Sequence, residues 1–309
     1  MKLAFVFPGQ GSQSVGMLAG FEGHEVVRGA FEEASAPIGV DLWKLAQSGP
    51  VEDLNLTVNT QPVMLAADIA IYRAWAALDA PLPEIVAGHS LGEYAALVAA
   101  GSLGLAQASA LVRFRAESMQ AAVPVGVGGM AAILGLDGDA VLSVCQAAAQ
   151  GEVVEAVNFN DPMQTVIAGH RGAVERACVL AKEAGAKRAL TLPVSAPFHS
   201  SLLQPAADRL AERLAGEAIR PPQVPVITNV DVAIVEDADA IRDALARQAA
   251  SAVRWVETIR RMEADGVTHV VECGPGKVLA GLVKRIAPGI ATFNILDANS
   301  LETTAGALS

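Results

Sequence analysis

The residues with the clearest chemical meaning form a G-x-S-x-G motif, Gly88-His89-Ser90-Leu91-Gly92. They follow a short apolar run, Glu84-Ile85-Val86-Ala87, and precede an alanine-rich stretch from Tyr94 to Ala100. Between a strand and a helix, this motif makes a sharp turn that exposes the serine hydroxyl, and glycine is needed where a side chain would clash. The first turn of the helix adds free N–H groups that suit an oxyanion. We therefore predict that Ser90 is a nucleophile in acyl chemistry.

A serine nucleophile needs a general base, and the chain has five histidines. His89 adjoins Ser90, so on an extended backbone its side chain points to the other face, and we expect it to pack or to form a hydrogen bond. His199 lies in Pro197-Phe198-His199-Ser200-Ser201, where the chain is expected to pass a cleft and enter a helix. His199 is therefore the candidate base. Surface or packed positions are expected for the other three, His24, His170 and His269.

The position of His199 separates two classes of serine enzyme. Ordinary α/β-hydrolases place the acid and then the histidine after the serine, with the histidine near the C-terminus. Here a long segment follows His199. The chain therefore departs from the hydrolase order.

A glycine-rich segment, Pro8-Gly9-Gln10-Gly11-Ser12-Gln13, follows the first apolar run of the chain, Leu3 to Phe7. A turn of this kind at the end of a strand can aim backbone N–H groups at an anion. It can also be a plain strand-to-helix connection, and the segment alone leaves both interpretations open.

Strands that alternate with helices predict the fold that positions these residues. Up to about residue 125, the strand at 3–7 and the strand before Ser90 alternate with helical patterns at 26–34, 61–78 and 105–120. This alternation predicts a parallel sheet covered on both faces, with Ser90 at the carboxyl edge of a strand. After residue 194 the pattern resumes, with helices at 203–214, 238–249, 256–264 and 278–286 and strands at 226–228 and 269–272. The small, polar tail from Asn299 is expected to be loosely ordered.

The segment between these stretches has a pattern of its own. The glycine-rich run from Val125 to Gly129 predicts a hinge. A β-α-β-β-α-β order follows, with elements at 130–136, 139–149, 153–158, 164–168, 173–184 and 187–192. That order is typical of a ferredoxin-like arrangement. We therefore expect an α/β fold with a large α/β-hydrolase-like subdomain, residues 1–125 and 196–309, and an inserted ferredoxin-like small subdomain, residues 126–195.

Composition limits the partners and the compartment. A chain of 309 residues, 52% of them hydrophobic, can bury a large core in two units. The net charge of −11 and the lack of a long basic run argue against nucleic acid. Cys145, Cys178 and Cys273 are far apart, which predicts neither a disulfide framework nor a metal site and fits a reducing cytoplasm. No run approaches the ~20 apolar residues of a membrane span, and the apolar N-terminal run is too short for a signal peptide.

Five segments together resemble the malonyl-CoA:acyl carrier protein transacylases of bacterial fatty acid synthesis. They occur in the family's order, between residue 6 and about residue 285, and are PGQGSQ at 8–13, GHSLGE at 88–93, Arg115 within RFRAESMQ at 113–120, PFHS at 197–200 and ECGPG at 272–276. The resemblance implies that Ser90 accepts the acyl group and that His199 acts first as base and then as acid toward the departing thiolate. Arg115 would hold the malonyl carboxylate in a two-pronged salt bridge, whereas Arg113 fits a solvated position.

The resemblance also implies supporting roles. Backbone N–H groups of Gln10 and Leu91 would form the oxyanion hole, and the backbone carbonyl of Gln248 would orient the base. Asn160 would lie near the cleft. In related acyltransferases of polyketide synthases, a leucine after the serine and a phenylalanine before the histidine accompany malonyl units, as Leu91 and Phe198 do here.

The implied reaction is a ping-pong transfer from malonyl-CoA to the phosphopantetheine thiol of acyl carrier protein, with no bound cofactor and no membrane. A monomer in the cytoplasm is expected. Lys187-Arg188 and Lys284-Arg285 are candidate contacts for an acidic carrier. Three alternatives stay open: a serine thioesterase or hydrolase, the malonyl transferase subunit of a malonate decarboxylase, and an inactive module that only docks a carrier. The first would release free malonate, and the intact Ser90, His199 and Arg115 argue against the last.

Overall fold

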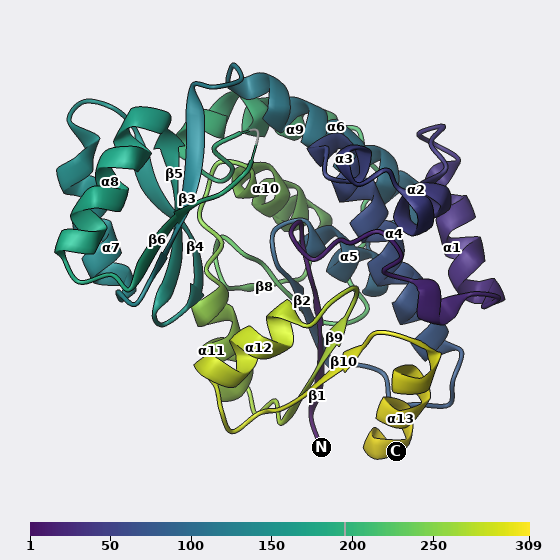
Figure 1. Cartoon of the computed structure of the whole chain (residues 1–309). Coiled ribbons are helices and arrows are strands. Elements are labelled where there is room, and N and C mark those ends of the chain that lie inside the picture. The colour runs from purple at the N-terminus through teal and green to yellow at the C-terminus, as the bar shows by residue number, and fades with distance from the viewer. Residues whose placement is uncertain (195) are drawn as a thin grey trace.

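Two β-sheets organise the chain in the computed structural model, which describes residues 1–194 and 196–309. One sheet has six strands in the order β10-β9-β1-β2-β7-β8, and the other has four in the order β4-β5-β3-β6. Figure 1 shows the four-stranded sheet and its two helices on the left, beside the larger unit. The predicted α/β fold, with a large sheet and a separate small one, is confirmed.

The large sheet is parallel except at one edge. Its strands are β1 (Leu3–Phe7), β2 (Ile85–Gly88), β7 (Val226–Ile227), β8 (Ile234–Val235), β9 (His269–Cys273) and β10 (Ala291–Ile295). Only β8 runs antiparallel to its neighbour. Side chains alternate between the faces along β1, so that Leu3, Phe5 and Phe7 pack into one core while Ala4 and Val6 pack into the other. Both faces are therefore covered, as the continuous apolar runs predict.

Helices cover the two faces of this sheet unequally. The larger core contains residues from α1 (Glu25–Ser35), α2 (Leu42–Ser48), α3 (Val51–Leu54), α4 (Thr57–Ala76), α5 (Gly92–Ala99), α6 (Leu105–Ala122), α9 (Gln204–Ala215), α10 (Ala238–Gln248) and α13 (Ala298–Leu308). The smaller core contains residues from α11 (Trp255–Ala264) and α12 (Val278–Ile286). Among the described residues, no helix is long and apolar enough to cross a membrane.

The small sheet is antiparallel and has its own core. It consists of β3 (Gly128–Leu134), β4 (Val154–Asp161), β5 (Gln164–His170) and β6 (Arg188–Thr191), with α7 (Gly138–Ala149) and α8 (Arg171–Glu183) packed on it. The predicted β-α-β-β-α-β order is therefore present. The last residue of the expected insert, Ser195, lies outside the described residues.

Backbone hydrogen bonds join the small sheet to the large unit. The N–H of Phe159 on β4 donates to the carbonyl of Val253 (3.0 Å), and the N–H of Val253 donates to the carbonyl of Val157 (2.8 Å). Val253 lies between α10 and α11 of the large unit. The edge of the small sheet is thus continued by a residue of its neighbour.

The expectation of a loosely ordered tail from Asn299 is wrong. Helix α13 begins with a capping box, in which the Asp297 carboxylate accepts from the N–H of Ser300 at 2.7 Å. Leu301, Ala305 and Leu308 lie on one face at helical spacing and are buried. The tail is helical because this sparse apolar stripe packs on the core, although small and polar residues dominate its composition.

Asp68, near the middle of α4, predicts an unusual pH dependence of stability. The side chain is 0% exposed, and neither carboxyl oxygen has a hydrogen-bond partner among the described residues. Burial, reinforced by the nearby charge of Glu272, raises the pKa of Asp68 well above its ordinary value. The folded chain therefore holds a proton that the unfolded chain releases, so stability is lost as pH rises from about 4 toward the folded pKa.

Asp68→Asn removes this titration while keeping the size of the side chain. We expect the variant to exceed the wild type in free energy of unfolding at pH 8, because only the wild type has a carboxyl group at this position that releases its proton on unfolding. The difference should shrink at pH 5. Urea denaturation at the two pH values measures it, and parallel pH profiles for the two proteins would contradict the prediction.

Candidate active site

The predicted sharp turn lies between β2 and α5. Ser90 has φ of 52°, in the left-handed region that most side chains avoid. A Cβ atom at Gly88 would lie 1.9 Å from the backbone of Gly92, and one at Gly92 would lie 2.0 Å from the carbonyl oxygen of Phe7. Only glycine fits at these two positions, and Ser90 sits directly beyond the carboxyl end of β2.

Asn229 holds this turn in place. Its Oδ1 accepts from the N–H of Ser90 at 2.7 Å, and its Nδ2 donates to the carbonyl of Gly88 at 2.7 Å. The side chain is fully buried. Strained backbone persists only where surrounding contacts fix it. Asn229 is not among the site residues predicted from the sequence, although a polar residue directly after the predicted strand at 226–228 was a usable signal.

His199 lies beside the nucleophile. Its Nε2 is 2.7 Å from Ser90 Oγ, and its Nδ1 is 2.8 Å from the carbonyl oxygen of Gln248. A carbonyl can only accept, so Nδ1 carries the proton and Nε2 is free to accept from the serine hydroxyl. Burial first, and then the positive charge of Arg115, lower the pKa of His199 to about 3. The imidazole is therefore neutral near pH 7 and can act as a base.

Arg115 approaches the same hydroxyl from α6. Its Nη2 donates to Ser90 Oγ at 3.1 Å and to Gln248 Oε1 at 2.8 Å, and its Nη1 donates to Gln61 Oε1 at 2.9 Å. The residue is 1% exposed, and within the described part of the chain no carboxylate forms an ion pair with it. The buried carboxyl group of Glu93 lies near enough to interact with this charge but does not contact the guanidinium. A buried cation that no carboxylate contacts is costly, so this site suits an anionic ligand.

Arg113 lies elsewhere, as expected for a solvated residue. Its Nε pairs with Glu117 at 2.7 Å on the surface of α6. Sequence reasoning gave no role to Gln61 or to the side chain of Gln248. Both are amides whose use depends on which donor they face in the folded chain, and no local pattern marks them.

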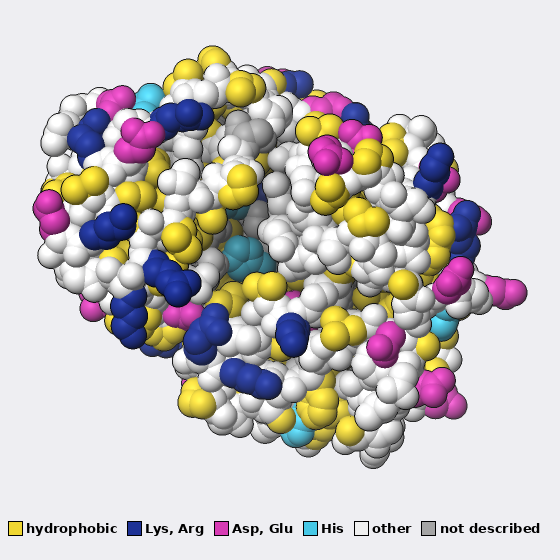
Figure 2. Space-filling view, viewed as in Figure 1, with side chains coloured by type: hydrophobic (Ala, Val, Ile, Leu, Met, Phe, Trp, Pro, Cys, Tyr) yellow, Lys and Arg dark blue, Asp and Glu magenta, His cyan; other side chains and the backbone are white. Residues whose placement is uncertain are grey.

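A cavity of about 280 Å³ opens beside these groups. Figure 2 shows the hollow between the two units, with a histidine at its base and basic side chains near its lower rim. The cavity is lined by further polar and apolar residues from both units besides Gln10, Ser90, Leu91, Arg115, Phe198 and His199. All of the predicted site residues except Gln248 contribute to this lining, and Gln248 lies directly behind Ser90 and His199.

The glycine-rich loop meets the turn at this cavity. A Cβ atom at Gly9 would lie 2.5 Å from the carbonyl oxygen of His89, so only glycine allows the close approach. No described residue accepts a hydrogen bond from the backbone N–H of Gln10 or of Leu91. These two N–H groups belong to residues that line the cavity, and they are available to a ligand oxygen.

His89 does not contact the hydroxyl. Its Nε2 forms a 2.8 Å hydrogen bond with Asn160 Oδ1 of the small sheet, and its ring packs edge-on against Trp255 at 5.4 Å. The prediction that His89 packs or forms a hydrogen bond is confirmed, since it does both. Asn160 lines the cavity, as expected for a residue near the cleft.

A neutral imidazole, a hydroxyl at a strained turn and unused N–H groups are the requirements of a serine acyltransferase, and the comparisons agree. The acyl transferase domain model matches residues 4–292. The malonyl CoA-acyl carrier protein transacylase of Escherichia coli K12 is 54% identical over 286 residues, which cover 92% of this chain and 93% of that protein. The chain therefore belongs to the malonyl-CoA:acyl carrier protein transacylase family.

Solved structures agree with this assignment. An acyl-carrier-protein S-malonyltransferase from Burkholderia pseudomallei 1710b has a TM-score of 0.98 and 60% identity, with 99% of this chain and 100% of that chain covered. A malonyl-transacylase in complex with a type II PKS acyl carrier protein also has a TM-score of 0.98, at 50% identity, with 99% and 100% covered.

Proposed function

We propose that the chain transfers a malonyl group from malonyl-CoA to the phosphopantetheine thiol of an acyl carrier protein and so supplies fatty acid synthesis. One observation carries the site assignment. The Ser90 hydroxyl lies 2.7 Å from the nitrogen of a neutral histidine and 3.1 Å from a buried arginine that no described carboxylate contacts. A single oxygen therefore meets a base and a binding group for a carboxylate.

In the first half of the reaction, His199 Nε2 takes the proton of Ser90 as Oγ attacks the thioester carbonyl. The carbonyl oxygen gains negative charge and accepts from the N–H groups of Gln10 and Leu91. Collapse of this intermediate breaks the C–S bond, and the His199 imidazolium gives its proton to the departing coenzyme A thiolate. Arg115 holds the far carboxylate of the malonyl group throughout.

In the second half, the carrier's thiol loses its proton to His199 and its sulfur attacks the malonyl-Ser90 ester. The C–S bond forms, the C–O bond breaks, and Ser90 recovers the proton.

The base has a neutral carbonyl behind it rather than a carboxylate, so its imidazolium receives little stabilisation. A thiol with a pKa of ~8.5 is activated far more readily than water with a pKa of ~15.7. This difference favours transfer over hydrolysis.

The proposed function is tested by intact mass after incubation with malonyl-CoA. A single malonyl adduct on the peptide that contains Ser90, discharged by a phosphopantetheine carrier to malonyl carrier, supports it. Release of free malonate at the rate of discharge would instead support the thioesterase alternative. The remaining alternative is the malonyl transferase subunit of a malonate decarboxylase. It is tested by comparing the rates at which a carrier of fatty acid synthesis and a carrier of malonate decarboxylase accept the malonyl group.

The proposed role of Arg115 predicts that it determines the preference for malonyl-CoA over acetyl-CoA. Arg115→Ala removes a charge-assisted contact with the malonyl carboxylate, which acetyl-CoA lacks. We expect the ratio of kcat/KM for malonyl-CoA over acetyl-CoA to fall by at least tenfold, or about 1.4 kcal/mol. Arg115→Lys is the matched control, because lysine keeps the positive charge but cannot form the two-pronged contact of a guanidinium. Its ratio should lie between those of the wild type and Arg115→Ala. An equal loss for both substrates would show that Arg115 serves folding or coenzyme A binding.

Further parts of the assignment are also proposals. Phe198 is 9% exposed and faces the cavity, where its ring would crowd an α-substituent on the acyl group and so favour malonyl units. The carrier is proposed to approach over Lys187 and Arg188, because strand β6 runs from there toward Leu192, which lines the cavity.

We propose the subdomain boundaries 1–125 with 196–309 and 126–195, supported by the separate core of the small sheet. A monomer is proposed because one chain supplies all the site residues named above. The cytoplasm is proposed because Cys145, Cys178 and Cys273 are free thiols.

A further inference from the structure

Glu93 is a buried carboxyl group that the mechanism above does not use. It lies in the first turn of α5, three residues after the nucleophile, and is 1% exposed. Within the described residues it forms no ion pair with a basic side chain. Burial raises its pKa to about 7. A carboxyl group is rarely buried without a partner, so its two hydrogen bonds need an explanation.

The first hydrogen bond fixes the side chain of Gln248. Glu93 Oε2 accepts from Gln248 Nε2 at 2.9 Å, and the same amide nitrogen donates to the carbonyl of Ser90 at 2.8 Å. The amide oxygen accepts from Arg115, which can only donate. The two hydrogens of the Gln248 amide therefore go to two acceptors, the backbone carbonyl of Ser90 and the carboxylate of Glu93.

Gln248 is also the residue that orients the base. It is the last residue of α10, and its backbone carbonyl accepts from His199 Nδ1. The carbonyls at a helix C-terminus lack the usual intrahelical donors, so other contacts must set their position. The side chain of Gln248, held by Glu93, supplies such a contact.

The second hydrogen bond fixes Asn229. Glu93 Oε2 accepts from the backbone N–H of Asn229 at 3.0 Å, and the side chain of Asn229 holds the Ser90 turn. One carboxylate oxygen thus contacts both the residue that orients the base and the residue that holds the nucleophile.

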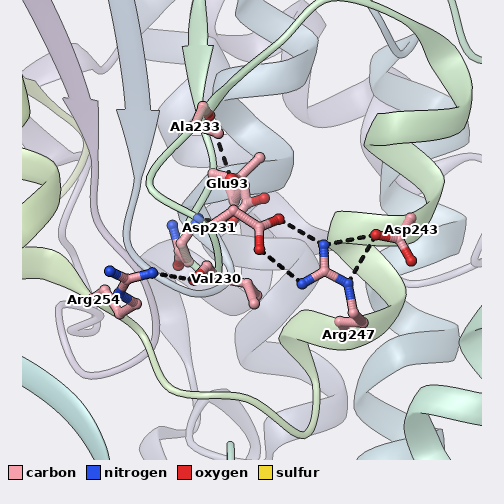
Figure 3. A network of polar contacts seen from close by, with 9 residues as sticks. Glu93, Val230, Asp231, Ala233, Asp243, Arg247 and Arg254 are labelled. Carbon is pink, nitrogen blue, oxygen red and sulfur yellow. Dashed lines mark hydrogen bonds and ion pairs between the residues drawn. The ribbon is translucent and has the colours of Figure 1, made fainter.

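Outer polar contacts surround the same two segments, and one ion pair among them, Arg247–Asp231, joins the two (Figure 3). Arg247, next to Gln248, makes a two-pronged pair with Asp231, two residues after Asn229, at 3.0 and 2.6 Å. Arg247 Nε also donates to Asp243 at 2.8 Å, and Arg254 donates to the carbonyl of Val230 at 3.0 Å. These pairs are partly exposed, so solvent weakens them, whereas the Glu93 hydrogen bonds are buried.

We propose that Glu93 is a positioning residue for acyl transfer: by holding Gln248 and Asn229, its carboxylate sets the alignment of Ser90 Oγ with His199 Nε2. This inference rests on the proposed function. It makes Glu93 necessary for the rate of the chemical step but not for binding of the acyl thioester, since Glu93 is not among the residues that line the cavity.

The test compares Glu93→Met with Glu93→Gln in rapid-quench measurements of acylation by malonyl-CoA. Met fills similar space but accepts neither hydrogen bond, so kcat should fall by about 10- to 100-fold, with KM within threefold of wild type. The amide oxygen of Gln can accept both, so Glu93→Gln should stay within threefold. If Glu93→Met does not fold, Glu93→Asp, with its shorter carboxylate, replaces it under the same expectation.

A spectroscopic measurement distinguishes positioning from loss of stability. The Nδ1–H proton of His199, hydrogen-bonded to Gln248, should give a sharp low-field resonance in wild type and Glu93→Gln and a broadened or shifted one in Glu93→Met. A Met variant that acylates like wild type, or whose loss lies wholly in KM, would overturn the inference. Failure of the wild type to form the Ser90 adduct would instead overturn the proposed function.

Discussion

Ser90→Ala is expected to leave the protein folded, to abolish the malonyl adduct and to lower malonyl transfer on the order of 10⁴–10⁶-fold, the loss found when a serine nucleophile is removed. The described residues that line the cavity include no second hydroxyl or thiol, so no neighbour can replace Oγ. The binding groups remain, so malonyl-CoA should still bind. Intact mass and carrier discharge measure the result.

Ser102→Ala provides a matched control for this experiment. The Ser102 hydroxyl belongs to a buried residue between α5 and α6 and lies outside the cavity, whereas Ser90 is partly exposed at the cavity. The control should acylate at the wild-type rate. A labelled adduct that persists on Ser90→Ala would place the nucleophile elsewhere in the chain.

His199→Ala should slow acylation by about 10²–10⁴-fold, the usual contribution of a positioned base. The loss is expected because the neutral Nε2 of His199 lies 2.7 Å from Ser90 Oγ. Without this nitrogen, the hydroxyl must lose its proton to water. Quenched-flow measurement of the malonyl adduct gives the rate. The adduct should still form slowly, because Ser90 and the N–H groups of Gln10 and Leu91 are retained.

His24→Ala is the control for a histidine outside the site, because His24 lies at the start of α1. Its acylation rate should match wild type. If His199→Ala acylates within twofold of wild type, His199 is not the base and the mechanism proposed above fails.

The sequence predicted those parts of the site that follow from local patterns. Gly88 and Gly92 flank Ser90 at a spacing that only a tight strand-to-helix turn requires, so the nucleophile could be found from a few residues. The base could be selected because His89 points away from the hydroxyl and His199 lies in a segment expected beside a cleft. Family resemblance, rather than spacing, supplied Arg115 and the carbonyl of Gln248.

The missed residues act through contacts between distant segments. Glu93 occurs within a motif, but its burial and its hydrogen bonds to Asn229 and Gln248 depend on segments more than a hundred residues away. The same reason explains why α13 was missed. Its stabilisation comes from packing against the core rather than from the composition of its own residues.

The backbone pairing of β4 with Val253 limits how the site can admit its substrates. Val157 and Phe159, which pair with Val253, flank Asn158 of the cavity wall. Widening the entrance by swinging the small sheet outward would break these two hydrogen bonds. Two backbone hydrogen bonds contribute on the order of 1–3 kcal/mol together, so this edge of the small sheet opposes such an opening without the help of any side chain.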